Sequence, residues 1–135
     1  MPLGKFLILY ALTVPVFFII DLIWLGLVAK GFYRKHLAAF LSPQVNWTAA
    51  IVFYLLYIVG ILIFAVLPAL ERRSQGRALL LGALFGLFCY ATYDLTNLAT
   101  LKNWPLLVTL ADLAWGAVLS GSVALVSYWI ALRLN

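Results

Sequence analysis

The chain has 135 residues, of which 67% are hydrophobic and 10% are charged. A soluble globular domain carries about 25% charged residues, so this composition excludes a soluble globular protein. The formal net charge of +5 raises the question of nucleic acid. The basic residues, however, occur in short clusters between apolar runs, as in membrane proteins. We therefore expect a protein whose partner is the lipid bilayer and which binds no nucleic acid.

Four apolar runs are long enough to cross a membrane, which requires about 20 residues. They cover residues 6–29, 47–70, 77–101 and 104–132. The first run exceeds the apolar region of a signal peptide, which is about 7–15 residues long, so we expect a retained span. The sequence thus predicts an all-α polytopic membrane protein, with four transmembrane helices in one bundle and a single domain over residues 1–135.

The segment from Lys30 to Leu41 mixes basic and apolar residues after the first predicted span. Two interpretations remain open: a short amphipathic helix in the headgroup region, or a solvated loop. His36 lies in this segment, where a lone histidine is expected to be solvated.

The predicted spans place both termini and the loop at residues 71–77 on one side of the membrane. This side carries five basic residues, namely Lys5, Arg72, Arg73, Arg77 and Arg133. The other side carries four, namely Lys30, Arg34, Lys35 and Lys102. The difference of one residue favours termini in the cytoplasm of a bacterial inner membrane.

Three of the four acidic residues, Asp21, Asp94 and Asp112, fall inside predicted spans. An aspartate near the centre of a membrane helix costs about 2.5–3.5 kcal/mol on insertion scales. Counted from the span ends at the Lys30 and Lys102 side, each lies roughly 10–12 Å into the membrane at 1.5 Å per residue. The sequence therefore predicts a tier of three acids at one depth.

Aromatic and amide side chains accompany these acids. Trp24 and Trp115 each follow an aspartate by three residues, which places each pair on one helix face. On the third span, Gly82, Gly86, Tyr90, Asp94 and Asn97 recur at helical spacing, and the glycines permit close helix packing. Tyr54 and Tyr57 reach a similar depth on the second span. We expect a ligand-binding pocket formed by Asp21, Trp24, Tyr54, Tyr57, Tyr90, Asp94, Asn97, Asp112 and Trp115.

No lysine or arginine is expected at the depth of the acids. At least one of them should then be protonated, or a cation should be bound. Asp21, Asp94 and Asp112 are candidate ligands for a divalent ion, since hard cations prefer oxygen. In the alternative interpretation, the aspartates hydrogen-bond tyrosine, tryptophan and Asn97 to hold the helices together. Trp24 and Trp115 would then suit an interfacial aromatic belt.

Cofactor chemistry has little support in the sequence. There is one cysteine, Cys89, and one histidine, His36. We find no haem, zinc or nucleotide signature, and we expect Cys89 to be a small packed side chain.

The motifs Asp21-Leu22-Ile23-Trp24-Leu25-Gly26, Tyr93-Asp94-Leu95-Thr96-Asn97 and Asp112-Leu113-Ala114-Trp115-Gly116 span most of the chain. In these motifs the chain resembles a bacterial family of predicted four-helix membrane proteins, domain of unknown function 2177. The resemblance implies the four-helix architecture and no activity.

Three functions remain open. An acidic and aromatic pocket suits the binding or transport of a cation, a proton-coupled solute or an amine-bearing solute, and a homodimer is expected because four helices make a narrow transporter. Paired carboxylates also suit an enzyme acting on a lipid or lipophilic substrate, although no nucleophile motif accompanies them. In an accessory or structural protein, the aspartates would hold the fold or engage a partner.

Overall fold

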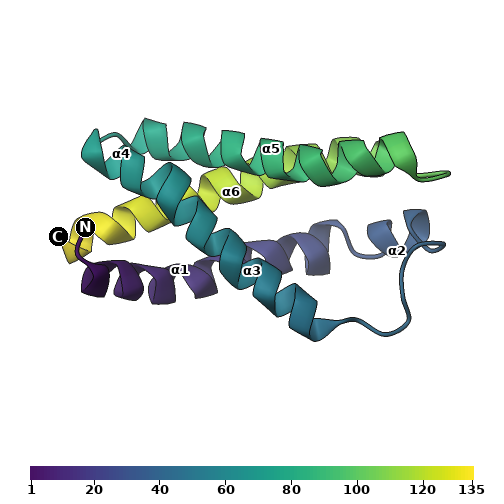
Figure 1. Cartoon of the computed structure of the whole chain (residues 1–135), viewed down its shortest axis with the longest axis horizontal. Coiled ribbons are helices and arrows are strands. Elements are labelled where there is room, and N and C mark those ends of the chain that lie inside the picture. Colours follow the sequence, from purple (N-terminus) through teal and green to yellow (C-terminus); the bar gives the residue numbers. More distant parts are fainter.

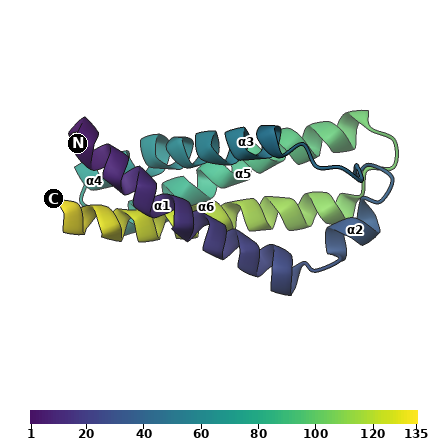
Figure 2. The same ribbon diagram turned by 90° about the horizontal axis from the view of Figure 1, so that it is seen from below.

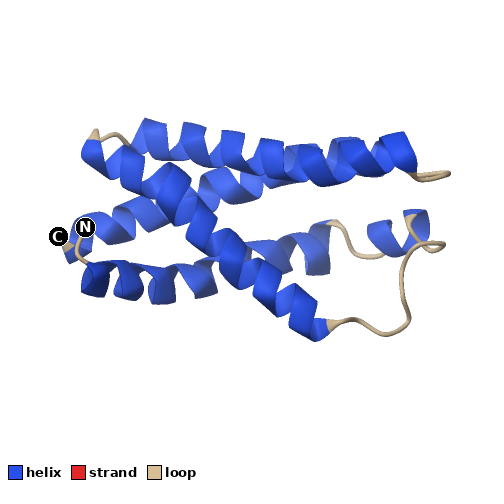
Figure 3. Cartoon of the chain, in the orientation of Figure 1, coloured by secondary structure: helices blue, strands red, loops and turns tan.

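The computed structural model describes residues 1–135. Its regular elements are all helices, joined by turns and loops, and there is no strand (Figure 3). Four stretches are long and apolar enough to cross a membrane. They are α1 (Leu3–Ile23) with the π-helical η1 (Trp24–Val28); α3 (Trp47–Ile61) with the π-helical η2 (Leu62–Val66) and α4 (Leu67–Glu71); α5 (Gln75–Thr100); and α6 (Leu106–Leu134). The predicted four-helix architecture is confirmed, with span boundaries that differ from the prediction by at most three residues.

Both termini lie at the same end of the molecule as α4, and α2 lies at the opposite end with the turn between α5 and α6 (Figure 1). The segment after the first span contains α2 (Phe32–His36), a helix of five residues. Gly31 precedes it with a φ of 79°, a left-handed conformation that glycine adopts without steric cost. The interpretation as a short helix is therefore correct for these five residues, and the rest of the segment is turn and loop.

Helices α5 and α6 pack with their backbones in contact. A Cβ atom on Gly86 would collide with the carbonyl oxygen of Gly116, and one on Gly82 would lie 2.6 Å from the carbonyl oxygen of Ser120. A Cβ atom on Gly116 would collide with the Tyr90 ring. The glycine stripe predicted for helix packing thus fixes the register of α5 against α6, and with it the heights of Asp94 and Asp112.

The second span crosses the bundle obliquely (Figure 1). Its later part, η2 and α4, packs on α5, whereas the beginning of α3 lies against α1. Phe17 and Phe18 of α1 contact Tyr54 of α3 with ring centroids 5.8 and 5.4 Å apart. Figure 2 shows α1 crossing α6 on another side of the bundle. The oblique path of α3 leaves its first turns apart from α5, next to the acidic residues.

Candidate functional site

The three aspartates of the spans are all buried in the bundle. Asp94 has no exposed surface, and Asp21 and Asp112 are 8% exposed. No lysine or arginine hydrogen-bonds to them, since the only donors are Trp115 for Asp21 and Tyr33 for Asp112. Three carboxyl groups therefore lie in a low-dielectric environment without a cationic partner.

Two Asp-x-x-Trp motifs on antiparallel helices contact each other through one hydrogen bond and one ring stack. The indole N–H of Trp115 on α6 donates to Asp21 on α1, with an Nε1–Oδ1 distance of 3.2 Å. Trp24, at the start of η1, stacks on Trp115 with ring centroids 4.6 Å apart and planes 8° apart. Because the spacing of three places aspartate and tryptophan on one helix face, the pairs meet across the helix interface. The two tryptophans are thus bundle residues and not an outward-facing belt.

Tyr33 of α2 connects Trp24 to Asp112. The Trp24 indole donates to the Tyr33 hydroxyl at 3.0 Å, and that hydroxyl donates to Oδ1 of Asp112 at 2.6 Å. Burial, and then the hydrogen bond to Asp112, raise the pKa of the Tyr33 phenol, so it remains a donor at physiological pH. The sequence interpretation missed Tyr33. The signal was Gly31, which turns the chain so that the aromatic residues after it fold back onto the spans.

Asp94 differs from the other two acids. Both its carboxyl oxygens are buried and have no hydrogen-bond partner of normal geometry. The polar side chains next to it are the Asp112 carboxyl group, across the α5–α6 interface, and the Trp104 indole, whose N–H donates to Thr109. An unpartnered buried polar group costs about 1–3 kcal/mol, and more when charged. Helix-holding hydrogen bonds account for Asp21 and Asp112 but not for Asp94.

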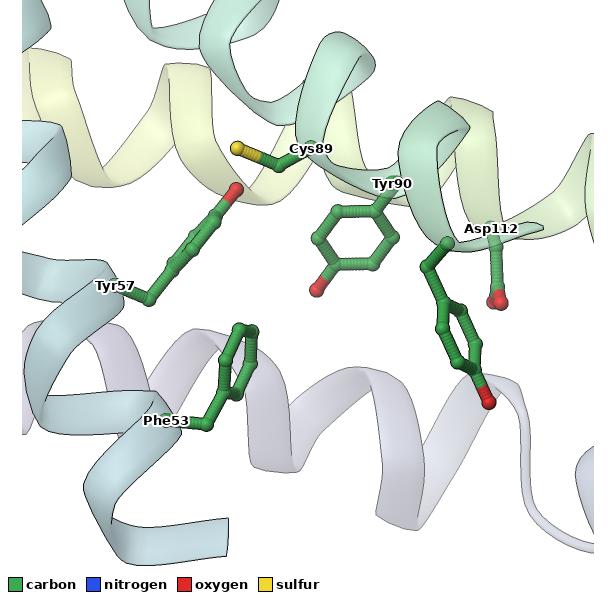
Figure 4. A pocket seen from close by; sticks show the side chains of 6 residues that line it. Phe53, Tyr57, Cys89, Tyr90 and Asp112 are labelled. Carbon is green, nitrogen blue, oxygen red and sulfur yellow. The ribbon is translucent and has the colours of Figure 1, made fainter. Parts of the chain in front are cut away.

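Two cavities open beside these residues. One, of about 240 Å³, has both Asp21 and Asp112 in its wall, together with Leu25, Leu37 and the aromatic residues Trp24, Tyr33, Tyr54, Tyr90, Tyr93 and Trp115. The other, of about 360 Å³, lies between α3 and α5 and is lined by Phe53, Tyr57, Cys89, Tyr90, Tyr93 and Asp112 (Figure 4). Asp112, Tyr90 and Tyr93 line both, so the two spaces meet at this carboxyl group.

The structure brings together most of the expected site residues. Asp94 and Asn97 line neither of the two cavities. Asn97 lies half-buried one turn beyond Asp94 on α5, towards the α5–α6 turn. No three His, Cys, Asp or Glu side chains are grouped so that they could hold a metal ion. The expected set Asp21, Asp94 and Asp112 is therefore not a metal-ligand cluster, because equal depth on three helices does not make their carboxyl groups converge.

The chain matches the family described as predicted membrane protein (DUF2177) over residues 6–129. The chain belongs to the DUF2177 family. No curated protein and no solved structure matches it. The family match supports the membrane location, and the four helices come from the structure itself.

Proposed function

We propose that this DUF2177 member binds a small amine-bearing cation within the membrane and carries it across in exchange for protons. The observation that carries the proposal is the unpartnered Asp94 beside Asp112, with no basic side chain bonded to either. Such a pair requires a proton or a cation to balance it, and intramembrane acids mark ion and solute pathways.

The walls of the smaller cavity support the choice of an amine. Carboxyl groups of Asp21 and Asp112 face the same space as the stacked Trp24 and Trp115. Aromatic faces attract ammonium groups within about 6 Å of the ring centroid, and desolvation strengthens that attraction. A site that combines carboxyl groups with aromatic faces recognises an organic cation better than a hard metal ion.

A binding experiment tests this proposal. The full chain in lipid nanodiscs is titrated with ethylammonium, and the intrinsic fluorescence of its five tryptophans, which include Trp24 and Trp115, is followed. We expect a saturable change that Asp112→Asn abolishes. Glu71→Gln is the matched control, because Glu71 is the one acidic side chain that is exposed, at the C-terminal end of α4. No fluorescence change, or one that Asp112→Asn leaves intact, would contradict the proposal.

A second candidate is an enzyme that acts on a lipid. The side-by-side carboxyl groups of Asp94 and Asp112, and the larger cavity on the lipid-facing side of α5, favour it. Two carboxyl groups in unlike surroundings can divide the roles of acid and base. Turnover of a labelled membrane lipid by the reconstituted chain, lost in both Asp94→Asn and Asp112→Asn, would favour the enzyme over the carrier.

We also propose that the termini are cytoplasmic in a bacterial inner membrane and that the working unit is a homodimer. The five basic residues on the terminal side against four on the other support the orientation. The small size of a four-helix carrier supports the dimer. A C-terminal fluorescent reporter that matures only in the cytoplasm tests the first point, and native mass spectrometry tests the second.

A further inference from the structure

The lipid-facing seam between α3 and α5 contains a continuous apolar groove. The cavity at Asp112 shares Phe53 and Tyr57 with a neighbouring hollow of about 390 Å³, which continues along α3 past Gly60 to Phe64. From Phe53 to Phe64 the groove follows eleven residues of helix, about 16 Å at 1.5 Å per residue. Its length and apolar lining suit a single extended hydrocarbon chain.

The groove opens to the hydrocarbon of the bilayer and not to water. Phe53, Phe64 and Tyr93 lie along it and are 50%, 62% and 57% exposed. All three belong to spans, so their exposed faces contact lipid. A molecule dissolved in the bilayer can therefore slide sideways into the groove without crossing an aqueous phase.

The one acidic side chain that lines the groove, Asp112, lies at one of its ends, and only Tyr33 donates to its carboxyl group. The Tyr57 hydroxyl is bonded to Ser120 at 2.6 Å, so this residue presents its ring to the groove. Figure 4 shows Phe53 and Tyr57 facing Cys89 and Tyr90 across the space, with Asp112 beyond them.

Charge complementarity decides what kind of chain fits. An anionic lipid would place its headgroup against Asp112 and the buried, unpartnered Asp94, with no basic side chain bonded to either. A neutral chain would bring no charge to the carboxyl pair and would leave protons alone to balance it. An ammonium group supplies both the missing charge and hydrogen-bond donors.

We propose that the ligand of this site is a lipophilic amine, a single-chain amphiphile whose hydrocarbon lies in the α3–α5 groove and whose ammonium group meets Asp112. This inference rests on the proposed cation-binding function and adds the substrate class and its lateral route from the bilayer.

Cys89 provides the test, because it is the only cysteine of the chain and it lines the groove. The full chain in nanodiscs is alkylated with N-phenylmaleimide, and the modified fraction is followed by intact mass spectrometry, with Cys89→Ser as the blank. Dodecylammonium at about ten times its dissociation constant should slow alkylation about tenfold by mass action. Dodecanol, with the same chain and no charge, and ethylammonium, with the charge and no chain, should each slow it less than twofold.

Two pairs of variants test the ends of the groove. Asp112→Asn should abolish the difference between dodecylammonium and dodecanol, and Glu71→Gln should preserve it. Leu56→Trp, which fills the hollow beside Phe53, should weaken protection by dodecylammonium. Val52→Trp, one turn earlier on the exposed surface of α3 and outside both cavities, should not.

The outcomes separate this inference from the proposed function. Equal protection by dodecanol and dodecylammonium, unchanged in Asp112→Asn, would show that the groove holds only adventitious lipid and would overturn the inference. An Asp112-dependent fluorescence response to ethylammonium without selective protection by dodecylammonium would also overturn it and leave the proposed function standing. Absence of any Asp112-dependent response to either amine would overturn both.

Discussion

Replacing Asp94 by asparagine should stabilise this protein, whereas the same change at Asp21 should destabilise it. Asp94 is fully buried, its carboxyl oxygens have no partner, and a second carboxyl group lies beside it. An asparagine at this position carries no charge, and its amide can donate to Asp112. Because an unsatisfied buried group costs about 1–3 kcal/mol, we expect the free energy of unfolding to rise by about that amount.

Asp21 is the informative comparison because its carboxyl group already accepts a hydrogen bond from Trp115. Asparagine retains an acceptor oxygen and loses the charge. A hydrogen bond to a charged group contributes about 1.5–3 kcal/mol and a neutral one about 0.5–1.5 kcal/mol, so Asp21→Asn should lower stability by about 1 kcal/mol. The two substitutions make the same chemical change and should have opposite signs.

Thermal unfolding in a mild detergent, followed by helical circular dichroism, measures both effects. For a chain of this size 1 kcal/mol corresponds to roughly 4 °C in Tm, so Asp94→Asn should raise Tm by roughly 4–12 °C. Glu71→Gln, at the exposed end of α4, should stay within about 0.5 kcal/mol of the parent protein. A fall in Tm for Asp94→Asn as large as that for Asp21→Asn would refute the reasoning, because Asp94 would then be a hydrogen-bonded helix contact.

Two further predictions concern the packing around the acids. Tyr33→Phe removes the donor to Asp112 and should lower the free energy of unfolding by about 1.5–3 kcal/mol at pH 7. Because the pKa of Tyr33 is raised in the folded chain, this contribution should be intact below pH about 10 and should decline at higher pH. Urea titrations of both proteins at several pH values measure it. Gly86→Ala forces a Cβ atom against the Gly116 carbonyl and should lower the free energy of unfolding by about 1–3 kcal/mol. Gly4→Ala, with open space around it, should be neutral or stabilising by up to about 1 kcal/mol. Equal Tm values for the two alanine variants would contradict the close contact of α5 and α6.

The sequence predicted the spans and the depth of the acids because both depend on one coordinate, the position along the membrane normal. Hydropathy determines where each helix enters and leaves the bilayer. The rise of 1.5 Å per residue then places Asp21 and Asp112 at similar heights, and the structure puts both in the wall of one cavity. The close-packing role of Gly82 and Gly86 was predictable for a similar reason, since their spacing of four puts both on one face.

The sequence could not predict how each helix is rotated about its axis relative to its neighbours. That rotation lets the Trp115 indole donate a hydrogen bond to Asp21 and leaves Asp94 with no partner. All three acids nevertheless have the same local context, an apolar run. The rotation also explains why the three carboxyl groups are not grouped as metal ligands. Hydrophobic periodicity is weak when lipid and core are both apolar, so it does not tell a bundle-facing side chain from a lipid-facing one.

Composition and hydropathy thus determined by themselves that this is a four-helix membrane protein with buried acids, because the bilayer imposes length and polarity on any chain that crosses it. The tertiary structure decided which groups meet the acids. Tyr33 reaches Asp112 from a five-residue helix outside the spans, through a turn at Gly31 that only the folded chain positions. The groove between α3 and α5 arises from the oblique path of the second span. Side-chain packing against α1 and α5 sets that path, and no local preference of the residues that line the groove does so.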